Sequence, residues 1–354
     1  MTGPSSEAND DREPSSEPLR PLDPVAGRRI PARKYVTATR VRRWIWGVSA
    51  IVIGAAAVAA FGDVRKLADQ LDGFYWPAFV GALGLALANY AIRLARWEAY
   101  LRRQEVVVPR RTSILVFGAG LSLSITPGKL GELVKSYLLR ELHDIPVTRT
   151  APIVVAERLT DLIALLLLAV VGSATYGIAT TLVISASCLI TLGLVLLAWP
   201  RPTRALIDLV STPRVVRRYR RQLHAMYDGV ATLCRPAPLT LATALAVPAW
   251  ACECVGFSLI VNAFPGAHLD LGLAMAIYAS TTIAGALSFL PGGLGVTEGA
   301  MTVLLVIGTA KLSRAVALDA TLLTRLATLW FAVILGLGCM VLARRLVAAR
   351  AKPA

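Results

Sequence analysis

The stretch of sequence that decides the fold is LIALLLLAVVGSATYGIATTLVISASCLITLGLVLLAWP, residues 162–200, which contains no charged residue. A helix needs about 20 apolar residues to cross a hydrocarbon core, so this stretch is long enough for two passes. In hydrocarbon every backbone amide must be paired within the chain, which makes helices the expected structure. Further uncharged stretches at 44–62 and 238–251 indicate additional spans.

The composition also places the chain among membrane proteins. Of its 354 residues, 56% are hydrophobic and only 17% are charged, and the mean hydropathy is +0.62. Soluble domains contain about 25% charged residues, so lipid is the expected solvent. A net charge of +15 would suggest nucleic acid in a soluble protein. Here the arginines cluster beside apolar spans, which is typical of cytoplasmic loops facing anionic lipid headgroups, and no nucleic-acid partner is expected.

Cysteine and histidine usage indicates neither a metal centre nor a disulfide framework. The five cysteines have no Cys-x-x-Cys spacing and lie in or beside apolar segments, and the three histidines are scattered along the chain. Zinc sites and disulfide frameworks need closely spaced ligands or cysteines. We therefore expect no metal site and no cofactor.

The sequence predicts three regions. Residues 1–43 are expected to form a disordered cytoplasmic tail, because 1–27 are rich in Pro, Ser, Asp and Glu, and 28–43 carry seven basic residues and no acid. Residues 44–346 would form the transmembrane domain, and 347–354 a short cytoplasmic tail. The expected fold class is an all-α polytopic plasma-membrane protein with both termini cytoplasmic. About six transmembrane helices are expected, at 44–61, 75–95, 152–177, 180–199, 238–261 and 320–343.

Two other apolar regions are interrupted at membrane depth. Region 113–140 breaks at TPGKLGE (126–132), and region 271–308 breaks at LPGGLG (290–295). Irregular backbone at this depth is tolerated only where it is buried in protein or lines a polar cavity. Both regions are therefore expected to be re-entrant helical hairpins that do not cross the membrane.

The two breaks form an internal repeat. The pattern SxxPGxLG occurs at 124–131 and at 288–295, and a glutamate follows each copy, Glu132 and Glu298. Further on, RLxxL occurs at Arg158 and again at Arg325. Three spans lie between the hairpins, and an odd number inverts the second copy, as in transporters whose binding site lies at broken helices. Pro-Gly pairs also end ordinary helices, so one copy alone would be structural.

Charged residues inside the spans are candidates for a binding site, since each costs about 2.5–3.5 kcal/mol on insertion scales. Arg158 and Arg325 occupy matching repeat positions and are expected to bind an anionic phosphate bidentately. Glu132 and Glu298 could pair with these arginines or take up a proton. Asp161 lies three residues after Arg158, so an ion pair between them is geometrically easy.

The hairpin glycines would let backbone amides and helix N-termini face the same anion. Arg96, beside Trp97, has an equal alternative as an interfacial anchor. Glu253 lies far from its helix ends, which favours a partnered interior position. The candidate substrate-binding residues are Arg93, Arg96, Ser124, Pro127, Gly128, Lys129, Gly131, Glu132, Lys135, Glu157, Arg158, Asp161, Glu253, Pro291, Gly292, Gly293, Gly295, Glu298 and Arg325.

Three segments together resemble the flippase-like family, the lysylphosphatidylglycerol synthase transmembrane region. They are TPGKLGE at 126–132 with Lys135, ERLxD at 157–161 and PGGLGVxE at 291–298. The resemblance covers roughly 45–345. It implies a lipid translocase similar to the flippase half of the bacterial multiple peptide resistance factor, with relatives that act on hopanoids or polyprenyl-linked glycolipids. The synthases carry a soluble aminoacyl-transfer domain after this region, and this chain is expected to lack that activity because it stops at Ala354.

The leading functional hypothesis is a translocase that moves an anionic or polyprenyl phospholipid between leaflets. One alternative is a non-catalytic membrane partner of a glycosyltransferase or lipid-modifying enzyme. Another is an enzyme acting on lipid phosphates with Glu157 and Asp161 as acid and base, but no histidine, nucleophile or metal cluster accompanies them. We expect no enzyme activity. The partners expected are the lipid substrate, anionic headgroups at the basic loops, and either a second copy of the chain or a lipid-modifying enzyme.

Overall fold

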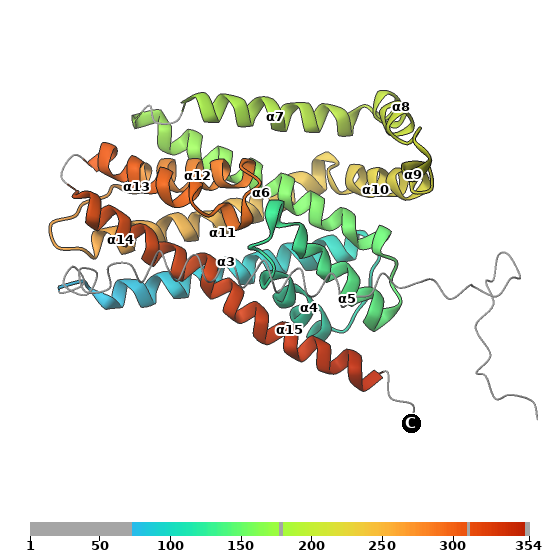
Figure 1. The fold of residues 1–354 in the computed structure, drawn as a ribbon, viewed down its shortest axis with the longest axis horizontal. Coiled ribbons are helices and arrows are strands. Elements are labelled where there is room, and N and C mark those ends of the chain that lie inside the picture. The colour runs from blue at the N-terminus through green and yellow to red at the C-terminus, as the bar shows by residue number, and fades with distance from the viewer. Residues whose placement is uncertain (1–72, 177–179, 310–311, 351–354) are drawn as a thin grey trace, which may run out of the picture. The chain divides into compact units, whose positions relative to one another are not determined.

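The computed structural model describes residues 73–176, 180–309 and 312–350, which belong to one compact unit, Ala60–Ala354. Every regular element among them is helical (Figure 1). The α-helices are α3 (Trp76–Arg103), α4 (Arg110–Leu121), α5 (Val134–His143), α6 (Val147–Tyr176), α7 (Thr180–Ala198), α8 (Pro200–Val210), α9 (Arg214–Arg217), α10 (Arg220–Leu233), α11 (Pro236–Asn262), α12 (Leu271–Leu287), α13 (Val296–Thr309), α14 (Arg314–Arg325) and α15 (Phe331–Arg350). Two 3₁₀ segments, η1 (Pro127–Leu133) and η2 (Pro291–Gly293), and a π-helical turn, Leu326–Trp330, complete the set.

Four helical stretches in the described residues are long and apolar enough to cross a membrane. They are Trp76–Arg103, Pro236–Asn262, Pro291–Thr309 and Arg314–Ala349, and a fifth is reached if the bent pair α7 and α8 counts as one span. The stretch Pro291–Thr309 belongs to region 271–308, which the sequence predicts not to cross, yet by length and composition it is able to do so. The chain is thus an all-helical, multi-pass membrane protein, as the composition indicates. The first predicted span, 44–61, and the predicted tail 1–43 lie outside the described residues. Of the predicted tail 347–354, residues 347–350 continue α15 and 351–354 lie outside the described residues.

The predicted helices are all present in the described part of the chain, with shifted ends. The helix predicted at 152–177 begins earlier, at Val147, and that predicted at 320–343 runs from Arg314 to Arg350 with a π-helical turn in its middle. A π turn interrupts the regular backbone hydrogen bonding of an α-helix. Within this turn the carbonyl of Thr328 accepts a hydrogen bond from the Tyr90 hydroxyl at 2.7 Å. The basic segment 201–221, where no helix is predicted, contains α8, α9 and the start of α10.

Both interrupted regions break where the sequence predicts. In each, an extended residue, Thr126 or Leu290, precedes a proline that opens a short 3₁₀ segment. Proline is tolerated in the first helical turn because the amide that it lacks would be unpaired there. Gly292 has a φ of +62°, a conformation that side-chain-bearing residues rarely adopt, so this position requires glycine.

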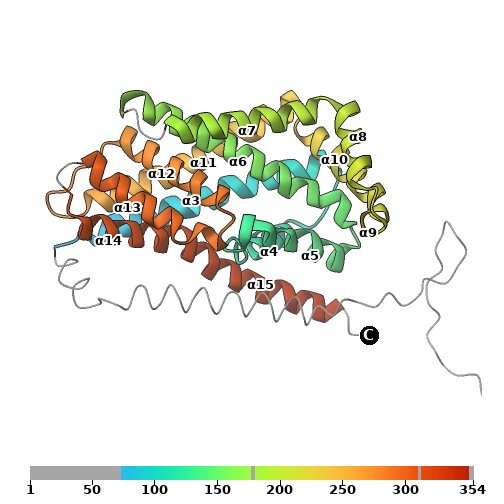
Figure 2. The same cartoon turned by 45° about the horizontal axis from the view of Figure 1, so that its top comes forward.

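The two breaks meet inside the bundle, although 164 residues separate Pro127 from Pro291 in the chain. The segments η1 and η2 are in contact, and a Cβ placed on Gly292 would lie 3.1 Å from Ile125 and 3.3 Å from Leu329. Helices α4 and α5 lie towards one end of the bundle, whereas α12 and α13 lie towards the other (Figures 1 and 2). The irregular backbone is therefore packed against protein.

Close helix packing brackets the first hairpin. Helix α15 contacts α4, where a Cβ on Gly118 would lie 2.5 Å from the Sγ of Cys339. Gly336, also on α15, faces the backbone of Ser122 directly, where α4 ends. Glycine permits this approach because it has no side chain. The end of α4, which leads into the first break, is therefore held in place by contact with the α15 backbone.

Candidate functional site: a buried charged cluster

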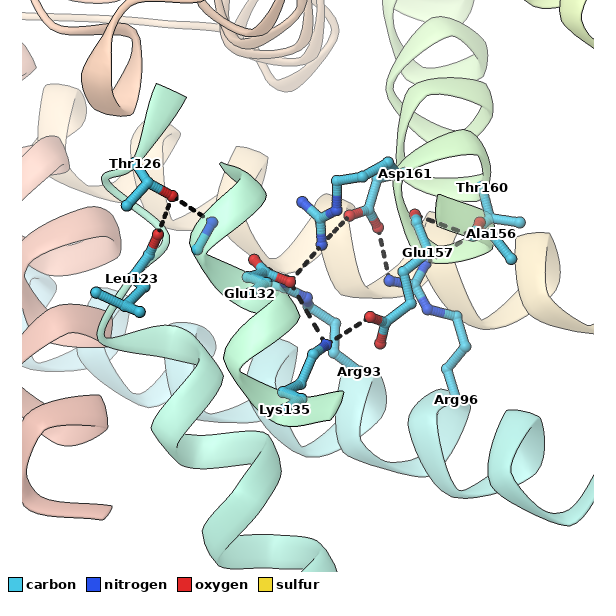
Figure 3. A network of polar contacts seen from close by, with 12 residues as sticks. Arg93, Arg96, Leu123, Thr126, Glu132, Lys135, Ala156, Glu157, Thr160 and Asp161 are labelled. Carbon is cyan, nitrogen blue, oxygen red and sulfur yellow. Dashed lines mark hydrogen bonds and ion pairs between the residues drawn. The ribbon is translucent and has the colours of Figure 1, made fainter. Parts of the chain in front are cut away.

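Seven charged side chains gather where α3, η1, α5 and α6 meet, and we call them the charged cluster (Figure 3). They are Arg93, Arg96, Glu132, Lys135, Glu157, Arg158 and Asp161. All seven belong to the predicted candidate set. Only Arg158 is appreciably accessible, with 21% of its side chain exposed, whereas the others are buried.

Lys135 lies at the centre of the acidic groups. Its Nζ is 2.5 Å from Glu157 Oε2 and 3.5 Å from Glu132 Oε2. The same ammonium lies 4.7 Å from the centre of the Trp97 ring and 5.6 Å from that of Phe117. Aromatic faces attract cations, so a buried lysine is retained here between two carboxylates and two rings.

Arg96 is tied to α6 and not to the membrane interface. Its Nη2 donates to Asp161 Oδ1 at 2.7 Å, and its Nη1 donates to Thr160 Oγ1 at 3.2 Å. The indole of Trp250 on α11 donates to the same Asp161 oxygen at 3.1 Å. With 1% of the residue exposed, Arg96 is an interior ion-pair partner, so the alternative interpretation as an interfacial anchor is wrong.

Arg158 on α6 links Glu132 of the first hairpin to Asp161 on its own helix. Its Nη2 is 3.1 Å from Glu132 Oε2 and 3.1 Å from Asp161 Oδ2, so the two expected ion pairs are present. Arg93 approaches Glu132 from α3 at 3.8 Å. Because Arg158 is the most exposed member of the charged cluster, it is the member most accessible to a ligand.

The second hairpin has a smaller counterpart of this arrangement. Arg325 Nε donates to Glu298 Oε1 at 2.6 Å, and its Nη2 donates to the carbonyl of Gly292 at 2.6 Å. Glu298 also accepts from the Gly295 amide at 2.7 Å, which caps the start of α13. In both repeats the hairpin glutamate therefore pairs with the arginine of a later helix, as the repeat predicts.

The remaining candidates lie apart from these ion pairs. Glu253 is buried and accepts a hydrogen bond from the Tyr278 hydroxyl on α12 at 2.5 Å.

The other candidates lie at the two breaks. Thr126 accepts a hydrogen bond from the Gly131 amide at 2.7 Å, which shapes the first break. Ser124 is buried beside the break, Pro127 is exposed and Pro291 opens the second break. Gly293 has a φ of +67°. The side chains at 128–130, which include Lys129, lie outside the described atoms.

Sequence reasoning missed several residues that hold the site together. Phe117 encloses Lys135 together with Trp97, which was expected only as an interfacial anchor. Thr160 and Trp250 bind the Arg96–Asp161 pair, and Tyr278 binds Glu253. The sequence could have indicated Thr160 as a site residue, since it lies between charged residues on α6. No local pattern identifies Trp250, because its partner is 89 residues away in the chain. Among the described residues no group of three His, Cys, Asp or Glu could hold a metal ion.

With this geometry in place, the comparison with known families is decisive. The family described as the lysylphosphatidylglycerol synthase TM region matches residues 44–336. The chain belongs to this family. It is also similar to a UPF0104 membrane protein of Methanothermobacter thermautotrophicus, with 24% identity over 325 residues that cover 83% of this chain and 94% of the relative. The matched region of the family contains both breaks, the charged cluster and Arg325.

Replacing Arg325 with glutamine should loosen the second hairpin. The change removes a charged donor to Glu298 and to the Gly292 carbonyl, and hydrogen bonds to charged groups contribute about 1.5–3 kcal/mol each. We expect a lower apparent melting temperature in detergent. Arg314→Gln, an exposed position on the same helix, is the matched control and should change little. Equal melting temperatures for both variants would contradict the role of Arg325 in the hairpin.

Proposed function

We propose that this member of the lysylphosphatidylglycerol synthase TM region family is a lipid translocase that moves an anionic phospholipid, including polyprenyl phospholipids, between leaflets. The observation that carries the proposal is the charged cluster, which lies at a broken helix inside the protein. Buried ionisable groups in a membrane protein usually face an interior path and mark the site of a polar substrate. We also propose that the chain transports lipid without catalysing a reaction.

The proposed topology is six spans plus two re-entrant hairpins in inverted repeats, in the plasma membrane, with both termini cytoplasmic. Three observations support it: the breaks meet, the hairpins lie towards opposite ends of the bundle, and each hairpin glutamate pairs with an equivalent arginine. In transporters of this kind the site lies where the repeats meet, and access alternates as one repeat moves against the other.

The charge of the cluster favours a particular headgroup. Its described members include four basic and three acidic side chains, which leaves one positive charge in excess. A phosphodiester carries one negative charge and would balance this excess. The Arg158 side chain is 21% exposed, against 12% for Arg325, so the proposal assigns headgroup contact to Arg158. It assigns positioning of the second hairpin to Arg325, which binds Glu298 and the Gly292 carbonyl.

Arg158→Gln is expected to slow lipid translocation at least about tenfold, because the loss of one charge-assisted contact corresponds to more than 1.4 kcal/mol. The measurement uses purified protein in liposomes with a headgroup-labelled fluorescent phosphatidylglycerol that a membrane-impermeant quencher reaches only from outside. Arg149→Gln on the same helix is the matched control, since Arg149 is half-exposed and its ion pair, at 3.6 Å, is with an exposed glutamate. Arg158→Lys should restore part of the rate by restoring the charge.

The same liposomes separate the alternatives. Translocation by the protein alone supports the proposal, and full transport by Arg158→Gln would refute the assigned headgroup contact. Transport that appears only when a lipid-modifying enzyme is added would favour the partner hypothesis. Conversion of the labelled lipid to a new chemical product would favour an enzyme.

A further inference from the structure

A pocket that shares Arg96 with the charged cluster points to a second binding position. It lies between α3 and α11, has a volume of about 240 Å³, and is lined by residues of both helices. From α3 come Arg96, Tyr100 and Arg103, and from α11 come Pro238, Leu241 and Leu245. The pocket therefore has basic groups on one side and apolar groups on the other.

The polar side of the pocket has unused binding capacity. Arg103 is exposed and makes no ion pair with any residue that the structure describes. Arg96 is almost fully buried, and its Nε has no hydrogen-bond partner among the described residues, although its Nη atoms bind Thr160 and Asp161. That Nε is enclosed by protein, so Arg96 contributes positive charge behind the pocket wall, and Arg103 is the basic group that a ligand in the pocket can contact.

The apolar side fits a hydrocarbon chain. Leu241 has 56% of its surface exposed, and Leu245 is partly exposed, so both offer aliphatic contacts to a molecule outside the protein. The pocket is smaller than the 300–1,000 Å³ typical of sites that enclose a whole ligand, so it takes only part of one. A molecule with an anionic head and an apolar tail that remains in lipid satisfies both sides.

We propose that the pocket between α3 and α11 is an entry site for an anionic phospholipid, with the phosphate at the exposed Arg103 and the first part of an acyl chain against Leu241 and Leu245. Arg96 belongs to both the pocket and the charged cluster, so it connects the entry site to the position assigned to the headgroup. The role of the pocket in lipid entry rests on the proposed translocase function, whereas lipid binding in the pocket does not depend on it.

The test measures lipid binding in nanodiscs and translocation in the fluorescent-lipid liposomes, with the same variants in both. Protein in nanodiscs of zwitterionic phosphatidylcholine is titrated with spin-labelled phosphatidylglycerol, and the immobilised fraction is recorded. Leu245→Trp narrows the pocket, and Arg103→Gln removes its exposed charge. Ala244→Trp is the matched control, since Ala244 is exposed on the same helix and does not line the pocket.

We expect Leu245→Trp and Arg103→Gln each to weaken phosphatidylglycerol binding about tenfold, the equivalent of 1.4 kcal/mol, and Ala244→Trp to leave it unchanged. Equal binding in all three variants would overturn the pocket assignment, and Arg103→Gln decides the matter if Leu245→Trp fails to fold. Weaker binding with an unchanged translocation rate would overturn the entry role. Intact binding by a wild-type protein that translocates no lipid would count against the proposed function and leave the lipid site standing.

Discussion

Lys135→Met is expected to lower the free energy of unfolding by about 3–5 kcal/mol, because it leaves the buried carboxylate of Glu157 without its ion-pair partner. Lys135 is the closest cation to Glu157 and also approaches Glu132, and both glutamates are almost fully buried. Methionine keeps the apolar length that packs against Trp97 but removes the charge. The apparent melting temperature in detergent should fall by about 10 °C, by the usual scaling for domains of this size.

Two further variants make this prediction specific. Arg140→Met lies on the same helix, α5, at an exposed position, and should have little effect. Adding Glu157→Gln to Lys135→Met should recover part of the lost stability, since the double variant no longer buries an unpaired charge. A melting temperature for Lys135→Met equal to that of Arg140→Met would show that the charged cluster does not stabilise the fold.

Gly336→Leu is expected to prevent α15 from packing against the end of α4 in the first hairpin. A Cβ at this position would lie 2.7 Å from the Cα of Ser122 and 2.8 Å from the carbonyl carbon of Leu121, both of them backbone atoms that cannot move aside alone. Overpacking of a core costs about 1–3 kcal/mol when side chains can yield, and more when backbone must shift. The yield of monodisperse protein on size exclusion should drop sharply.

Gly338→Leu provides the matched control. It lies on the same helix two residues away, and a Cβ there meets nothing within 4 Å. The same substitution should therefore be tolerated, with leucine facing lipid. If both variants gave similar yields, the close contact between α15 and the end of α4 would not be a requirement for folding.

Much of the fold follows from local patterns in the sequence. Uncharged runs predict helices because lipid cannot satisfy backbone amides, and the Pro-Gly breaks at 126–132 and 290–295 lie where the structure interrupts its helices. The amphipathic character of α8 was overlooked because its arginines marked the region as a basic loop. In the structure α8 turns by 96° from α7 and leaves Leu206 and Leu209 exposed.

The repeat correctly paired each hairpin glutamate with its arginine, because equivalent positions in a repeat meet equivalent partners. Other contacts needed the tertiary structure. Glu157 pairs with Lys135 from another segment, and Asp161 receives Arg96 and Trp250 from two more helices. Helical spacing relates residues within one element only, so it cannot specify which distant segment supplies a partner.

The sequence alone therefore determined that the chain is helical, lies in the membrane, breaks at two related points and places charges beside them. The physical reason is that lipid allows few backbone structures and makes each intramembrane charge costly, which leaves a local signal. The tertiary structure alone decided that the breaks touch, that Lys135 lies between two glutamates, and that Arg96 lines a pocket between α3 and α11 as well as belonging to the charged cluster. Those features depend on how helices pack, and packing joins residues far apart in the chain.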